Sequence, residues 1–107
     1  MDSQRIYIGT KLKYKIVITS AGFDMDTDNW EVTVKCGGNS QTFAKLDCIH
    51  RDNDWFVVFD TEDFGKGTYY AIIKAYVPDT DFDGGIRTEV TVVILCKVMD
   101  IVPEIIW

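Results

Sequence analysis

Apolar and polar residues alternate with a period of two along most of this chain, which predicts β-strands rather than helices. Across residues 11–18 the even-numbered positions are apolar, whereas three of the four odd-numbered positions are lysine. Residues 30–36 repeat this alternation, and the run from Trp55 is apolar on both faces, as expected for a strand in the middle of a sheet. The longest candidate strands span residues 68–77 and 87–98. This periodicity predicts an all-β domain.

Shorter candidate strands at residues 5–8 and 41–49 bring the total to about seven, with clusters of glycine, asparagine and aspartate between strands. Such a series on a rhythm of roughly ten residues predicts an antiparallel β-sandwich. The length of 107 residues fits one domain, which we place at residues 1–100, followed by an apolar C-terminal tail at residues 101–107. In the one helix-like fragment, Thr61 is predicted to cap a single turn.

The chain is acidic, with a formal net charge of −6. This balance disfavours a protein that neutralises nucleic-acid phosphates and a protein that binds an anionic membrane surface. No apolar run reaches the roughly 18 residues of a membrane span, and the N-terminus lacks the pattern of a signal peptide. We therefore expect either a mature form from which a signal has been removed or a protein that is made and kept in a cytoplasm.

Three widely spaced cysteines do not suggest a disulfide framework. Cys36 and Cys96 lie in apolar strand patterns, which predicts buried free thiols and folding in a reducing compartment. Cys48 and His50 could be a nucleophile and its base, but strand neighbours two apart lie about 7 Å apart along the chain. We expect instead a solvated histidine near a turn, and no enzyme activity. Zinc would have to gather all four of these side chains without a C-x-x-C pair.

Two acidic runs supply the candidate metal ligands. Their carboxylates belong to Asp24, Asp26, Asp28, Asp79, Asp81 and Asp83. The second run, followed by Gly84, matches the first half of an EF-hand calcium loop, but Val90 occupies the position of the closing acid. The two runs are expected at one end of the sandwich, so a shared calcium site is one hypothesis, and solvated aspartate turns are the favoured one. The sequence therefore predicts no bound cofactor, and calcium is the one alternative.

Two features are candidates for contact with a partner protein. The first is a basic stripe on one strand, made of Lys11, Lys13 and Lys15. This stripe either protects an exposed strand edge or contacts an acidic neighbour. The second is the apolar tail, with Ile105, Ile106 and Trp107 beyond the last predicted strand. Such a tail packs either on its own domain or on another subunit.

The segment FGKGTYYAII resembles the approach to the sixth strand of immunoglobulin-type domains, where a G-x-Y motif places a tyrosine at a corner between the sheets. Residues 67–69 match that motif. The resemblance implies an immunoglobulin-like sandwich in which Trp30 is the core tryptophan of the third strand. The chain departs from the antibody pattern at Gly65, where aspartate is usual, and at Ala71, where cysteine is usual.

A narrower resemblance rests on three phrases in order along the chain, GFDMDTDNWEV, GKGTYYAIIKAYVPD and DFDGGIRTEV. They are similar to small immunoglobulin-like structural proteins of tailed phages that infect Bacteroides-type gut bacteria. The resemblance implies a non-enzymatic virion protein, made in the host cytoplasm and present in multiple copies per particle. The favoured role is an auxiliary or decorating capsid protein that docks on the major capsid protein, without contact with nucleic acid or membrane. The alternatives are a tail or baseplate adaptor and a bacterial cell-surface carbohydrate-binding module.

Overall fold

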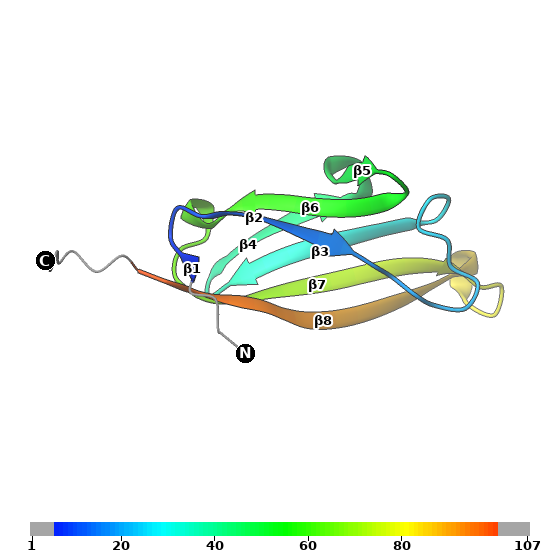
Figure 1. Cartoon of the computed structure of the whole chain (residues 1–107). Helices are drawn as coiled ribbons and strands as arrows, with labels where there is room; N and C mark the ends of the chain where they lie inside the picture. Colours follow the sequence, from blue (N-terminus) through cyan, green and yellow to red (C-terminus); the bar gives the residue numbers. More distant parts are fainter. Residues whose placement is uncertain (1–5, 101–107) are drawn as a thin grey trace, which may run out of the picture.

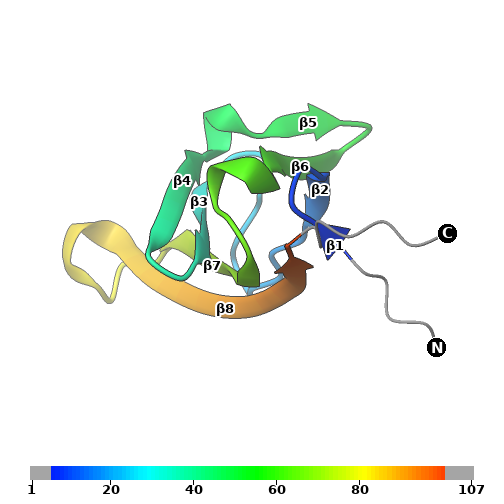
Figure 2. The ribbon, with the colours of Figure 1, turned by 90° about the vertical axis from the view of Figure 1, so that its left-hand side faces the viewer.

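The protein is a two-layered β-sandwich, seen in a computed structural model that describes residues 6–100 (Figure 1). One layer is a five-stranded sheet in the order β1 (Ile6–Tyr7), β8 (Ile86–Met99), β7 (Gly67–Pro78), β3 (Asn29–Cys36) and β4 (Asn39–Ala44). The other layer is a three-stranded sheet in the order β2 (Lys11–Ile16), β6 (Asp54–Asp60) and β5 (Ile49–Arg51). Figure 2 looks along the strands and shows the smaller sheet above the curled larger one.

The predicted all-β sandwich is confirmed, with two corrections. Residues 6–100 form eight strands rather than about seven, because residues 41–49 do not form one strand. A short 3₁₀ turn, η1 (Lys45–Asp47), separates β4 from β5 and sends them to different sheets. The pairing is also not wholly antiparallel, because β1 lies parallel to β8 with Ile6 opposite Val98. These two strands come from opposite ends of the domain, so local alternation carries no information about their relative direction.

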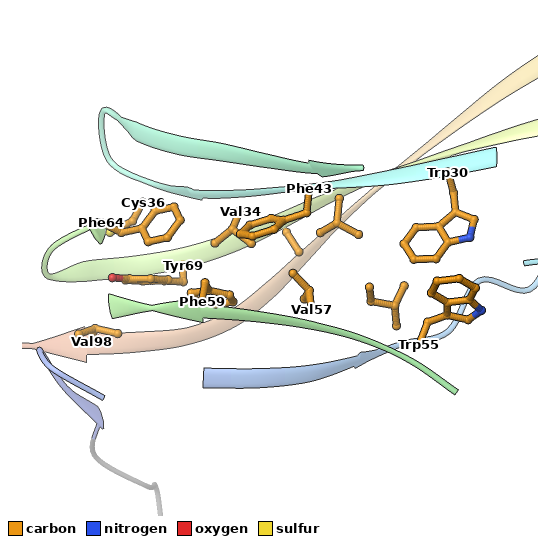
Figure 3. Packing of buried hydrophobic residues seen from close by; sticks show 13 residues of the cluster. Trp30, Val34, Cys36, Phe43, Trp55, Val57, Phe59, Phe64, Tyr69 and Val98 are labelled. Carbon is orange, nitrogen blue, oxygen red and sulfur yellow. The ribbon is translucent and has the colours of Figure 1, made fainter. Parts of the chain in front are cut away.

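The predicted inward faces form the core between the two layers. Every second residue of β3 is buried, from Trp30 to Cys36. β6 lies between β2 and β5, as expected for a central strand, and it buries Trp55, Val57 and Phe59. Figure 3 shows Trp30 and Trp55 facing each other from opposite sheets, and their ring centroids lie 5.2 Å apart in an edge-to-face contact. Aromatic pairs in this geometry add to the stability that burial alone provides.

Tyr69 lies at the corner that its motif predicts. Its side chain is fully buried, and its hydroxyl donates to the backbone carbonyls of Gly65, at 2.6 Å, and Thr61, at 3.1 Å. The bonds tie the start of β7 to the segment that follows β6. Trp30 is also fully buried on β3, in the place that the resemblance to immunoglobulin-type domains implies.

The helical elements of the described residues are three short 3₁₀ turns. Besides η1 they are η2 (Thr61–Asp63) and η3 (Asp83–Gly85). Within residues 6–100, none of the helical segments has the length and apolar character needed to cross a membrane.

The cap of η2 is Asp60 rather than Thr61, so the predicted cap is wrong by one residue. The Asp60 carboxylate accepts the backbone N–H of Glu62 at 3.0 Å. Thr61 is fully buried instead, and its hydroxyl accepts the N–H of Gly9 and donates to the carbonyl of Thr10. The hydroxyl thus fastens η2 to the chain that leads into β2, a contact between segments about fifty residues apart that no local pattern reveals.

Candidate functional site

Exposed apolar side chains gather on the outer face of β8. Val90, Val92 and Ile94 are 56%, 61% and 68% exposed. Two residues of β7 extend this surface, because Val92 pairs with Ile72 and Ile94 pairs with Tyr70. We call these five residues the β8 apolar face. Contiguous exposed apolar surface is costly in water and marks binding sites on soluble domains.

A bulge divides β8 into two parts. Tyr70 pairs with Ile94, whereas Tyr69 pairs with Cys96, so Leu95 is an extra residue on β8. An extra residue reverses the side of the sheet on which the following side chains lie. Even-numbered residues therefore face outward before Leu95, whereas Val98 beyond it lies in the core. One strand thus supplies both outer apolar surface and core.

β8 also presents an open backbone edge. β1 covers only its last residues, where Ile6 pairs with Val98 and Tyr7 with Met99. Within the described part of the chain, no strand pairs with this edge over residues 86–97. The unpaired N–H and C=O groups of an edge strand are a template on which another strand can be added.

An apolar groove lies between the open edge of β8 and β2, which is an edge strand of the smaller sheet. Its volume is about 350 Å³, and a hollow of about 200 Å³ continues it along β8 towards Glu89. The lining comes from both edges and from the core between them, and it includes Tyr14, Ile16, Val57, Ala71, Val93 and Leu95. We call the two hollows together the β2–β8 groove. Among residues 6–100, no strand bridges the gap between these two edges, so the described part of the sandwich is open along this side.

A wider depression of about 630 Å³ surrounds Trp55 at one end of the sandwich. His50 stacks on the Trp55 ring with centroids 4.1 Å apart. The Asp26 carboxylate accepts the indole N–H of Trp55 at 3.1 Å and lies 3.5 Å from Nε2 of His50. Lys45 donates to the backbone carbonyls of Asp26 and Asp28. His50 is half-exposed near a turn, as predicted, but it is held by stacking rather than freely solvated.

Three of the six aspartates in the two acidic runs accept hydrogen bonds from the backbone of their own turns. The Asp24 carboxylate accepts the backbone N–H of Asp26, and the Asp28 carboxylate accepts that of Asp24, both at 2.8 Å. The Asp79 carboxylate accepts the N–H of Asp81 at 3.0 Å. The prediction that these side chains bond to nearby backbone is confirmed for Asp24, Asp28 and Asp79.

The two acidic loops lie at the same end of the sandwich, as predicted (Figure 1). Asp79 forms an ion pair there with Arg87, which leaves its charge compensated, and Asp83 begins η3. Among residues 6–100, no three histidine, cysteine, aspartate or glutamate side chains are grouped so that they could hold a metal ion. The shared calcium site stays a prediction.

The basic stripe on β2 is exposed and partly engaged with its own sheet. Lys13 Nζ lies 4.4 Å from the centroid of the Phe56 ring, and Lys15 forms an ion pair with Asp54 at 3.3 Å. Lys11 is exposed as well. A partner contact through the stripe stays a prediction. The tail residues predicted for partner contact lie outside the described residues: Ile105, Ile106 and Trp107.

The three cysteines are free thiols. Cys36 is buried as predicted, whereas Cys96 is only half-buried. Burial, together with the nearby charge of Asp47, raises the pKa of the Cys48 thiol to about 11. A thiol with this pKa stays protonated near neutral pH, which is the opposite of what an activated nucleophile beside His50 needs.

Comparison of the chain with protein-family models, curated proteins and solved structures found no match.

The β8 apolar face and the β2–β8 groove are the two surfaces that the sequence did not single out. A local signal for the face exists, because residues 92–95 are apolar at both odd and even positions. The groove has no local signal, since it depends on which strands end up at the edges of the two sheets.

Proposed function

We propose that this protein is a non-enzymatic structural protein of a tailed-phage virion, an immunoglobulin-like auxiliary or decorating protein that docks on the capsid lattice. Its expected partner is the major capsid protein, with multiple copies per particle and synthesis in the host cytoplasm. The observation that carries the proposal is the β8 apolar face, together with the resemblance of the three ordered phrases to phage structural proteins. Burial of apolar surface contributes about 25 cal/mol per Å², so this face favours a protein partner over water.

A tail or baseplate adaptor remains the alternative within the virion. A carbohydrate-binding module needs an exposed aromatic ring on which a sugar can stack. Trp30 and Trp55 do not offer one, because they are 0% and 9% exposed and His50 already stacks on Trp55. Phe82, which is 50% exposed between two aspartates, is the ring best placed for that alternative.

The first test is mass spectrometry of purified particles beside a lysate control. We expect the protein to be enriched in the particles, and its absence from them would rule out the virion role.

The second test places a charge on the docking surface. Val92→Lys should lower the amount of protein on the particles about tenfold or more, because a buried unpaired ammonium costs well over the roughly 1.4 kcal/mol that corresponds to a tenfold change. Thr42→Lys, on β4 at the far edge of the same sheet, is the matched control and should leave particle binding unchanged. Equal binding of both variants would contradict docking through the β8 apolar face.

A further inference from the structure

We propose that the β2–β8 groove accepts residues 101–107 of a second copy of this chain, which add to the open edge of β8 as an extra strand. This inference goes beyond the proposed virion role and does not depend on it, because the two partners are identical chains.

The groove has the two things that an added strand needs. The open edge of β8 offers unpaired backbone donors and acceptors beside the groove. The floor of the groove is made of core side chains, including Val57 and Ala71, so apolar side chains that enter it extend the existing core. A strand laid along β8 would also close the sandwich between its two edge strands.

The sequence of residues 101–107 has the pattern that such a strand requires. Its odd-numbered positions carry three large apolar side chains and Pro103, and Glu104 lies among the even-numbered positions between Val102 and Ile106. Because strand side chains alternate between faces, the odd-numbered set can enter the groove while Glu104 faces water. Pro103 lacks an N–H group, which an outermost strand tolerates because alternate N–H groups point away from the sheet. The same proline discourages pairing of a further strand on the outer side.

The length of residues 101–107, and the place where the chain leaves β8, favour insertion into the groove of a second copy rather than into the groove of the same molecule. The segment has seven residues and spans about 23 Å when extended, and β8 between Glu89 and Leu95 has the same number of residues. The chain leaves β8 at Met99, roughly 33 Å along the strand from Glu89. A reversal uses at least two residues, so the remaining five reach back only about 17 Å. β1 also occupies the edge beside Met99, where such a reversal would begin. The far part of the groove is therefore within reach only of another molecule.

The test is sedimentation velocity on the purified full-length protein over a range of concentrations. The wild-type chain should self-associate as its concentration rises. Val93→Lys, in the groove, and Ile105→Lys, on the apolar side of the segment, should each be monomeric. Mixed in equal amounts, these two variants should form a heterodimer, because one chain supplies an intact segment and the other an intact groove. A monomeric wild type at every concentration, or a mixture that stays monomeric, would overturn the proposal.

Matched controls separate this result from misfolding and from the virion role. Glu104→Lys alters the same segment on its water-facing side and should self-associate like the wild type. Loss of the wild-type near-ultraviolet circular dichroism by Val93→Lys would show that this variant is misfolded. The comparison of Ile105→Lys with Glu104→Lys then tests the proposal alone. Identical self-association of these two variants would overturn it. Val92→Lys, on the opposite face of β8, should self-associate normally while it weakens particle binding. The self-association proposal and the virion proposal can therefore fail independently of each other in these experiments.

Discussion

The hydroxyl of Tyr69 connects the start of β7 to the segment that follows β6. It bonds to the carbonyls of Gly65 and Thr61 from a fully buried position. Thr61 in turn bonds to Gly9 and Thr10 on the segment that enters β2. A chain of three hydrogen-bonded segments therefore joins both sheets at this end of the sandwich. A fully satisfied buried network of this kind makes one arrangement more favourable than its competitors.

Tyr69→Phe should lower the free energy of unfolding by about 2 kcal/mol, because it leaves the Gly65 carbonyl without its closest donor while preserving the ring. Chemical denaturation measures the change. Tyr70→Phe is the matched control on the outer face of the same strand and should shift stability by less than about 0.5 kcal/mol. Equal effects of the two substitutions would mean that the corner bonds do not stabilise the fold.

At the scale of single residues, sequence predicts those roles that a local motif fixes. Tyr69 was predicted from G-x-Y, and the aspartate turns were predicted from spacing within a few residues. The cluster around Trp55 was not, because Asp26, Lys45 and His50 come from three separate segments and meet only after the sheets form. The buried role of Thr61 was missed for the same reason.

Among the elements, the loop between β2 and β3 is held by hydrogen bonds from two core tryptophans as well as by apolar packing. The Asp26 carboxylate accepts the Trp55 indole N–H, and the Met25 carbonyl accepts that of Trp30 at 3.0 Å. Two core tryptophans from opposite sheets therefore hold the loop by their polar edges. This arrangement satisfies both indole donors, and it adds polar contacts to a loop whose Phe23 and Met25 side chains also pack against the core.

Asp26→Ala should accelerate amide hydrogen exchange across residues 19–28 and lower the free energy of unfolding by about 1 kcal/mol, because the Trp55 indole loses its acceptor. Asp26→Asn keeps an acceptor oxygen at the same place and should exchange like the wild type. Faster exchange in both variants would instead assign the effect to the lost charge beside His50.

β8 shows what periodicity can and cannot predict about an element. The sequence placed a long strand at residues 87–98, and the structure has it at Ile86–Met99. The bulge at Leu95, the outer apolar face and the open edge were not predicted. The outer apolar face of β8 depends on strand register, and its open edge depends on strand order. Both are set by contacts between residues far apart in the sequence. The break between β4 and β5 was missed because Leu46 and Cys48, two residues apart, imitate the alternation of a strand through η1.

At the scale of the whole molecule, buried acidic groups set the response of stability to alkali. Burial is the largest cause of the raised pKa values of Cys48, to about 11 from 9.0, and of Tyr69, to about 12 from 10.0. Both groups are neutral in the folded protein at a pH where the unfolded chain has begun to ionise. Their contribution to stability is complete below about pH 9 and is lost as the pH rises towards 11 and 12.

We therefore expect the free energy of unfolding to be level from pH 7 to 9 and to fall above pH 9, as measured by urea denaturation at a series of pH values. Cys48→Ala should make the fall between pH 9 and 11 less steep, because one of the groups that ionises only in the unfolded chain is gone. The slope should be unchanged below pH 9. An identical slope above pH 9 would show that Cys48 ionises equally in both states.

The parallel pairing of β1 with β8 sets how the domain responds to mechanical load. The chain enters at β1 and leaves at β8, and the two strands run in the same direction side by side, with the N–H of Ile8 adding a bond to the Met99 carbonyl. Tension between the two ends pulls these neighbours past each other along their length, so the bonds that join them are strained together rather than opened one after another. If the domain were anchored through both ends, it would resist stretching by shear between β1 and β8.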